Sequence, residues 1–274
     1  MNFSKKKAAI LLVALVMVWV GNLYWYNRNL LKEPVFVKCY YDLQGNMPIT
    51  LHYYQNSEDN FGVVGISFPE LNNQFVPCND LWKGSTKYYK NKEVNIYFNT
   101  LEDVKRITND KEVKITKVNV QFGNGKNVIV DIGEIYLTPS FNDKPLFNGN
   151  SSYADSNNEG RTIVTATSDG VIKGFNNKFN LNLSDIIKIE LNGKLINPTD
   201  FPVKFKTGDT IVVKYNFNFK DENDIRRNYF YQLSSIINCE HSAEEKSNVF
   251  IDIHYDPDIN KIDVKTLEKE RGNN

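Results

Sequence analysis

The chain has 274 residues with 33 basic and 33 acidic side chains, so its formal net charge at pH 7 is zero. Because Lys and Arg are scattered and form no basic stripe, this composition does not favour binding to nucleic acid or to an anionic lipid surface. The chain beyond its first apolar segment exceeds the commonest single-domain length and fits two domains of ordinary size.

Residues 8–26, AAILLVALVMVWVGNLYWY, form the first distinct segment, which carries no charge and one strongly polar side chain, Asn22. As a helix it is about 28 Å long at ~1.5 Å per residue, close to the hydrocarbon thickness of a bilayer. A helix in a soluble core would show polar side chains on its solvent face at every turn. The segment is therefore a membrane span or the apolar part of a signal peptide.

The flanks of this segment favour an anchor that stays on the protein. Signal peptidase requires small side chains at positions −3 and −1. With Gly21 at −1, position −3 is Trp19, which is too large. Tyr24, Trp25 and Tyr26 end the segment with amphipathic rings that suit the lipid headgroups. A cleaved signal peptide remains the alternative.

Charge on either side sets the expected orientation. Lys5, Lys6 and Lys7 precede the span, whereas Arg28 and Lys32 follow it, so we expect the N-terminus inside a cell membrane and the body outside. The short tail leaves no room for a cytoplasmic effector domain, so any signal passes to a membrane partner. Trp19 and Asn22 are the candidate contacts for such a partner. The expected segments are a tail (1–7), a span (8–26) and a juxtamembrane linker (27–34).

The first part of the body reads as a β-rich domain over 35–138. Runs of β-branched and aromatic residues separated by turn residues predict strands at 35–42, 48–54, 61–68, 93–98, 113–122 and 128–137. Apolar and polar residues alternate in 118–122 and 128–132, which predicts a hairpin with one dry face. Thr100 is the expected N-cap of a short helix that begins at Leu101.

Residues 139–160 lose all periodicity and predict a linker or a long loop. Strands resume over 161–267 and predict a second domain, a β-sandwich, with a tail at 268–274. Asn192-Gly193 favours a two-residue hairpin turn. The stretch KTGDTIVVKY (206–215) resembles a bacterial immunoglobulin-like repeat over one strand and its turn, which implies a fold and no function. The expected fold is thus mainly β: a single transmembrane helix and two β-sandwich domains, with an immunoglobulin-like arrangement as one option.

The three cysteines allow one disulfide. Cys39 and Cys78 are able to pair within the first domain if the body lies outside the cell, and the alternative is that all cysteines are small buried residues. Cys239 and His241 are zinc-type ligands, but no second pair lies at finger spacing.

An acidic cluster near the C-terminus has oxygen ligands at alternate positions, as a calcium loop does: Asp256, Asp258 and Asn260. Lys261 and Leu267 occupy positions where an EF-hand loop needs Gly and Glu. We therefore favour a tight turn with no cofactor, and keep Ca²⁺ as the weaker alternative.

Adjacent aromatic residues are the other candidate site. Neighbours on a strand point to opposite faces, so one ring of each pair leaves the main core. Such rings are able to line a surface for a sugar, an extended peptide or a protein partner, or else to fill contacts inside the body. The candidate surface residues are Tyr40, Tyr53, Tyr54, Tyr88, Tyr89 and Tyr231.

These features favour a non-catalytic binding or scaffolding role in a cell envelope of bacterial type. The expected partners are the bilayer, wall polymer or envelope proteins, and nucleic acid is not among them. The sequence has no Gly-X-Ser-X-Gly motif and only three His. Alternatives are a hydrolase of wall polymer and an accessory subunit of a membrane complex.

Overall fold

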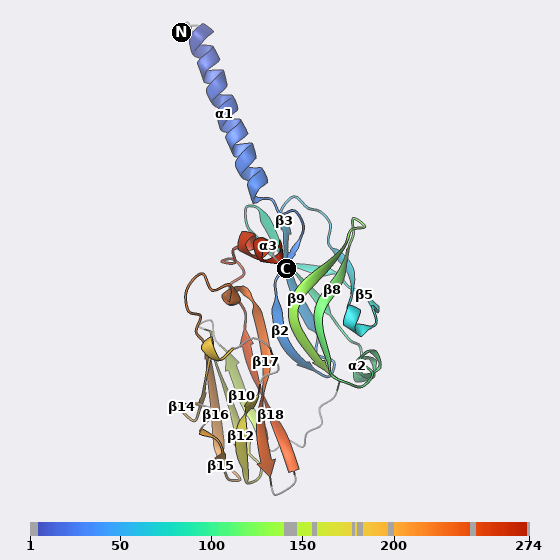
Figure 1. The fold of residues 1–274 in the computed structure, drawn as a ribbon, viewed down its shortest axis with the longest axis vertical. Coiled ribbons are helices and arrows are strands. Elements are labelled where there is room, and N and C mark those ends of the chain that lie inside the picture. Colours follow the sequence, from blue (N-terminus) through green and yellow to red (C-terminus); the bar gives the residue numbers. More distant parts are fainter. Residues whose placement is uncertain are drawn as a thin grey trace.

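The structure is a computed structural model that describes residues 5–139, 147–154, 158–176, 179, 183–196, 200–241 and 245–272. Helix α1 (Lys5–Asn29) stands clear of the β-rich body (Figure 1). Among the described residues, α1 is the one helix that is long and apolar enough to cross a membrane by length and composition. Its apolar part extends over Ala9–Asn29, and the body buries no residue in the most apolar stretch of this range.

The lobe next to α1 is a sandwich of two sheets. One sheet is antiparallel, in the order β1-β3-β7-β6, and the other contributes the order β2-β9-β8-β4-β5. Tyr53 from the first sheet meets Phe122 from the second with ring centroids 6.2 Å apart. The strands are β1 (Val35–Phe36), β2 (Cys39–Gln44), β3 (Ile49–Asn56), β4 (Val63–Ser67), β5 (Phe75–Pro77), β6 (Asp80–Ser85), β7 (Tyr89–Ile96), β8 (Val113–Phe122) and β9 (Asn127–Thr138).

The lobe far from α1 is a second sandwich (Figure 1). One sheet has the order β10-β11-β16-β13-β14, and the facing strands β15, β12, β17 and β18 continue the sheet of the first lobe. Phe217 and Tyr255 meet across the space between the sheets, with ring centroids 4.9 Å apart. The strands are β10 (Phe147–Ala154), β11 (Glu159–Ala166), β12 (Gly170–Asn176), β13 (Ile187–Leu191), β14 (Lys194–Leu195), β15 (Val203–Phe205), β16 (Thr210–Phe217), β17 (Phe230–His241) and β18 (Glu245–Tyr255).

Strand β17 joins the two lobes. Strand β18 pairs along one edge of β17. Along the other edge, the first residues of β17 pair in parallel with β2 and its later residues pair with β12. Tyr231 of β17 stacks on Tyr40 of β2, with centroids 5.5 Å apart and planes at 16°. The apolar core therefore runs from one lobe into the other, and the lobes share a sheet.

Several predicted elements are confirmed. The hairpin β8–β9 buries Val118, Val120, Phe122, Val130 and Ile132 on one face. Helix α2 (Leu101–Thr108) begins at Thr100, whose hydroxyl accepts the Asp103 amide while the Asp103 carboxylate accepts the Thr100 amide. Asn192 and Gly193 have φ of 50° and 80°, as a type I′ hairpin turn between β13 and β14 requires.

Of the segment expected to link the domains, residues 147–154 are part of the second sandwich. Residues 147–154 form β10, which pairs with β11 from Phe147↔Ala166 to Ala154↔Gly160. Strand β10 lies at the edge of its sheet, and a bulge falls between Gly149 and Ser151. Edge strands are commonly polar and irregular, so they lack the alternation of apolar and polar residues from which a strand is predicted.

The C-terminus also differs from expectation. The run 261–267 was predicted as a strand and 268–274 as a tail, but helix α3 spans Val264–Gly272. The Asp263 carboxylate accepts the amides of Lys265 and Thr266 at the helix start. Val264 and Leu267, three residues apart, are buried on one face of α3. This helix returns to the first lobe and packs beside β1.

Candidate functional site

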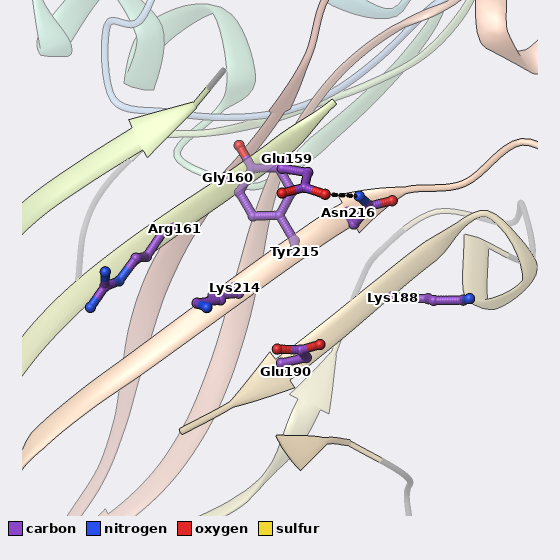
Figure 2. A pocket seen from close by; sticks show the side chains of 8 residues that line it. All are labelled: Glu159, Gly160, Arg161, Lys188, Glu190, Lys214, Tyr215 and Asn216. Carbon is purple, nitrogen blue, oxygen red and sulfur yellow. Dashed lines mark hydrogen bonds between the residues drawn. The ribbon is translucent and has the colours of Figure 1, made fainter. Parts of the chain in front are cut away.

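A shallow depression of about 600 Å³ lies on the outer face of the sheet β11-β16-β13 in the distal lobe (Figure 2). We call it the distal depression. Its lining comes from three neighbouring strands, so residues far apart in the sequence meet on one surface. The lining residues are Glu159, Gly160, Arg161, Lys188, Glu190, Lys214, Tyr215 and Asn216.

Strand register places the charged side chains in rows across the sheet. Arg161 lies opposite Lys214, and Lys214 lies opposite Glu190. The next row joins Glu159, Asn216 and Lys188. Because side chains alternate between faces, Ile211, Val213, Tyr215 and Phe217 of β16 are buried while Lys214 faces solvent.

The charges of the distal depression are poorly matched within the protein. Arg161, Lys188 and Lys214 form no ion pair with any residue that the structure describes. Glu159 accepts a hydrogen bond from Asn216 Nδ2 at 2.7 Å (Figure 2). Guanidinium and ammonium groups recognise carboxylate and phosphate oxygens. The lining also contains the carboxylates of Glu159 and Glu190, so its net charge is +1, and an anionic group that binds there contacts the cations of more than one strand.

The floor of the depression is fixed by Gly160 and Tyr215. A Cβ at Gly160 would lie 2.1 Å from Tyr215 Cζ, so only glycine leaves room for the ring. The Tyr215 hydroxyl accepts the His254 amide at 3.1 Å and lies 3.3 Å from the His254 carbonyl oxygen, to which it donates. These bonds join the two sheets of the distal sandwich beneath the charged surface.

A second polar feature, the neck, is the set of contacts that holds the end of α1 against the body. Asn56 at the end of β3 accepts the Leu31 amide at 2.7 Å and donates to the Leu31 carbonyl at 3.0 Å. The Tyr89 hydroxyl donates to the Asn29 carbonyl at 2.6 Å. Lys265 Nζ of α3 donates to the Leu30 carbonyl at 2.8 Å. A cation at the C-terminal end of a helix is favourable because the last carbonyls lack helical partners.

The chain just after α1 is held as well. Glu33 pairs with Lys126 of the β8–β9 turn at 2.7 Å and with Arg271 of α3 at 3.0 Å. The hydrogen bond from Lys126 keeps the pKa of Glu33 below its ordinary value, with a smaller contribution from Arg271. The Lys32 amide donates to Glu268 Oε1 at 3.0 Å. The direction of α1 is therefore coupled to the first lobe.

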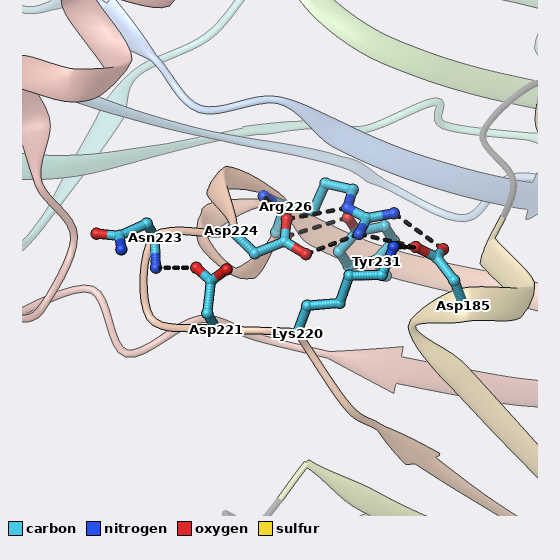
Figure 3. Close-up of polar contacts among 7 residues, drawn as sticks. All are labelled: Asp185, Lys220, Asp221, Asn223, Asp224, Arg226 and Tyr231. Carbon is cyan, nitrogen blue, oxygen red and sulfur yellow. Dashed lines mark hydrogen bonds and ion pairs between the residues drawn. The ribbon is translucent and has the colours of Figure 1, made fainter.

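A third cluster ties two loops at the junction of the lobes (Figure 3). Arg226, in the 3₁₀ turn Ile225–Asn228, forms bonds of 3.0 and 3.1 Å with both oxygens of Asp185. It also contacts Asp224 Oδ2 at 2.7 Å, and Lys220 pairs with Asp185 at 3.1 Å. The bonds from Arg226 and Lys220 lower the pKa of Asp185 to about 2. Tyr231 donates to the Arg226 carbonyl, which links this cluster to β17.

Most of the predicted tyrosine surface lies inside the body, so that part of the prediction is wrong. Tyr40, Tyr53, Tyr54 and Tyr231 are all buried, because β2 and β3 are covered on both faces. The buried hydroxyls find internal partners: Asp80 for Tyr53, the Ile259 carbonyl for Tyr54 and the Arg226 carbonyl for Tyr231.

Tyr88 and Tyr89 differ from the other four because both are half-buried at the neck. Tyr88 lies with its ring centroid 6.1 Å from that of Tyr26 at the end of α1. These two tyrosines remain candidates for a partner surface.

The disulfide considered between Cys39 and Cys78 is not formed, since both are free thiols. Cys39 is buried in β2, where its thiol lies 3.3 Å from the Ile132 carbonyl, whereas Cys78 lies beyond the edge strand β5. Burial raises the pKa of Cys78 to about 11, with a smaller effect from Asp80. The zinc-type pair at Cys239 and His241 lies outside the described side chains.

The acidic turn shows ordinary protein partners. Asp256 pairs with His254 at 3.0 Å, and Asp258 pairs with Lys261 at 3.1 Å. Asp258 also accepts the Asn260 amide at 3.1 Å, which closes the turn. Within the described ranges no group of three or more His, Cys, Asp or Glu is placed to hold a metal ion. Calcium at this turn stays a prediction.

Trp19 and Asn22 lie on the part of α1 that the body leaves exposed, and Trp19 is 66% exposed. Residues three apart share one face of a helix, so these two side chains are neighbours. A contact with a membrane partner there also stays a prediction.

Sequence reasoning missed the distal depression and the neck. The signal for the depression was present in charged residues at alternate positions of β11 and β13 and in Lys214 among the apolar residues of β16. However, alternation does not reveal which strands are neighbours, and the charged side chains meet only after β11, β16 and β13 pair.

No protein-family model matches the sequence, and no curated protein matches it. Among solved structures, the chain is similar to a chicken TCR, with 10% identity over 82% of this chain and 100% of that chain at a TM-score of 0.25. It is also similar to the class 5 fimbriae chaperone CfaA, with 11% identity over 80% of this chain and 98% of that chain at a TM-score of 0.23. Scores this low carry no argument about function, and the β-sandwich description rests on the strand pairing given above.

Proposed function

We propose that the chain is a membrane-anchored extracytoplasmic protein of a cell envelope, and that it binds an anionic ligand in the distal depression without catalysing a reaction. The observation that carries the binding proposal is the set of Arg161, Lys188 and Lys214, which face one depression and lack ion-pair partners among the described residues. The ligand class is a phosphate- or carboxylate-bearing polymer, since the cations are spread over three strands.

The anchoring part of the proposal is supported by α1. The helix span of 21 residues is about 31 Å long at ~1.5 Å per residue, enough to cross a hydrocarbon core of about 30 Å. The lysines that precede it favour a cytoplasmic N-terminus. The distal depression lies in the lobe farther from α1 (Figure 1), where a ligand outside the membrane is accessible.

The non-catalytic part of the proposal is supported by the lining of the depression. Among the eight residues that line it, none is Ser, Cys or His, so the lining offers no Ser–His or Cys–His pair for nucleophilic catalysis. A membrane partner on the helix face of Trp19 and Asn22 is compatible with this role. It would make the chain a ligand-binding subunit of a larger assembly.

Binding is tested with the full chain reconstituted in phosphatidylcholine nanodiscs. Fluorescent polyphosphate and polyglutamate are the anionic probes, and dextran is the neutral one. The triple variant R161S/K188S/K214S removes the cations of the depression. K111S/K117S/K204S removes the same charge from exposed positions elsewhere on the body and serves as the matched control.

We expect at least one anionic probe to bind and the depression variant to weaken it about tenfold, because each exposed ion pair contributes roughly 0.2–1 kcal/mol. The control should stay within about twofold. Equal weakening by both triple variants, or no binding beyond that of dextran, would overturn the proposal.

A further inference from the structure

The tip of the β6–β7 hairpin, residues 85–89, lies against the last turn of α1. The ring of Tyr88 has its centroid 6.1 Å from that of Tyr26. Tyr89 donates its hydroxyl to the Asn29 carbonyl at 2.6 Å. The Ser57 amide donates to the Tyr88 carbonyl at 2.8 Å, which holds the tip to the end of β3. The tip is thus fixed relative to α1 by a ring contact and by hydrogen bonds.

This position sets the depth of the tip in a bilayer. Tyr26 belongs to the aromatic group that ends the apolar segment, and Tyr and Trp at the end of a span lie at the headgroup level. The polar layer on each side of the hydrocarbon core is roughly 5–7 Å thick. A ring whose centroid is 6.1 Å from that of Tyr26 therefore lies in or beside the same layer.

The chemistry of the tip suits that layer. Tyr88 is half-buried, and Lys87 is exposed with its Nζ 5.2 Å from the centroid of the Tyr88 ring. The tip sequence, Ser-Thr-Lys-Tyr-Tyr, contains no acidic residue. Lys87 and Arg28, which lies in the last turn of α1, form no ion pair with a described residue. A tyrosine ring with a lysine ammonium beside it presents an apolar body and a polar, cationic end, as residues at a membrane interface do.

We propose that the hairpin tip is a second membrane contact: Tyr88 and Lys87 touch the lipid headgroups beside α1. The inference rests on the proposed anchoring and adds a role for the body. A single span lets a body rock over the bilayer, whereas a second contact beside a fixed neck restricts its tilt. The distal depression is then held at a set orientation to the membrane.

The contact is tested in the full chain by tryptophan quenching in nanodiscs that contain headgroup spin-labelled lipid. The native tryptophans Trp19, Trp25 and Trp82 are replaced by Phe, and Tyr88→Trp is added as the reporter. The matched control carries Tyr97→Trp instead. Tyr97 is exposed just beyond the far end of β7, so it lies about 25 Å from Tyr89 at ~3.3 Å per residue. A third variant keeps only Trp25 and reports on the anchor.

We expect the headgroup label to quench the Tyr88→Trp reporter at least threefold more strongly than the Tyr97→Trp control, and to quench Trp25 about as strongly as the reporter. If Trp25 is quenched but the Tyr88→Trp reporter is quenched no more than the control, the tip contact is overturned. The proposed anchor is then still supported. Absence of quenching at Trp25 contradicts the anchor itself. If the Tyr88→Trp protein lacks the circular dichroism of the parent, Lys87→Trp reports on the same tip with the same expectations.

Discussion

His52 of β3 and Phe230 of β17 lie face to face, with ring centroids 3.8 Å apart and planes at 6°. The contact joins the antiparallel sheet of the first lobe to the strand that runs into the second lobe. His52 is largely buried, and its Nδ1 atom has no hydrogen-bond partner among the residues that the structure describes. Burial lowers the pKa of His52 to about 4, although Glu93 and Asp256 oppose that shift and Lys83 adds to it.

Stability should therefore depend on pH through His52. Its pKa is lower in the folded state than the ordinary value of 6.5, so the unfolded chain binds the proton more readily between pH 6.5 and 4. The contribution of neutral His52 to the free energy of unfolding is fully present above about pH 6.5. It is lost as the pH falls toward 4, and the total loss is about 3 kcal/mol. Denaturant unfolding of wild type and His52→Phe between pH 4 and 7.5 measures it.

The difference between these two proteins isolates the histidine, because carboxylates that titrate in the same range are common to both. We expect His52→Phe to lose less stability than wild type on acidification. Parallel pH profiles for the two proteins would contradict the role assigned to this side chain.

Gly160→Ala should destabilise the distal lobe. The added Cβ lies 2.1 Å from the Tyr215 ring, which is tied to β18 through His254 and has little freedom to move. Overpacking of this kind costs about 1–3 kcal/mol, which corresponds to a fall in Tm of several degrees. Gly174→Ala is the control, since a Cβ there meets nothing within 4 Å. Equal thermal stability of both variants would show that the ring can shift.

Asn56→Ala should loosen the neck. It leaves the amide and the carbonyl of Leu31 without their partner, and Leu31 is only 5% exposed. Leaving buried polar groups unpaired costs about 1–3 kcal/mol each unless water reaches them. Hydrogen exchange of residues 29–33 in nanodiscs measures the effect, with Asn60→Ala, at an exposed position, as control. Unchanged protection in Asn56→Ala would mean that α1 is held by its other contacts.

Cys78 should react slowly with a thiol reagent, and Cys39 should react only after unfolding. A pKa of about 11 leaves little thiolate on Cys78 at pH 7.5, and Cys39 is 1% exposed. Pulsed alkylation of the folded and unfolded protein, followed by peptide mass spectrometry, distinguishes the two sites. A peptide pair linked through Cys39 and Cys78 would refute the free-thiol assignment.

The elements that sequence predicted correctly depend on local chemistry. The capping box at Thr100, the turn at Asn192-Gly193 and the alternation in β8 each act within a few residues. By contrast, Tyr40 and Tyr231 were assigned to a surface and are buried, because β2 lies between β9 and β17 and is covered on both faces. Nothing within β2 itself reveals that a strand almost 200 residues later will pair with it.

The candidate site follows the same rule. A balanced net charge argued against nucleic acid and an anionic lipid surface as partners, yet Arg161, Lys188 and Lys214 gather on one face after strand pairing. Likewise Tyr88 was singled out as half of a tyrosine pair, but its neighbour Tyr26 lies more than sixty positions earlier in the chain. Composition averages over the molecule, whereas binding depends on which side chains become neighbours.

The central claim, an uncleaved helix with the body outside, is tested most directly by the intact mass of the membrane-extracted protein together with protease access in spheroplasts. We expect a chain that still contains residues 8–26, resists extraction by alkaline carbonate, and loses its β-rich body to protease added outside. A mature chain that begins beyond Gly21, or a body protected until the membrane is lysed, would contradict the claim.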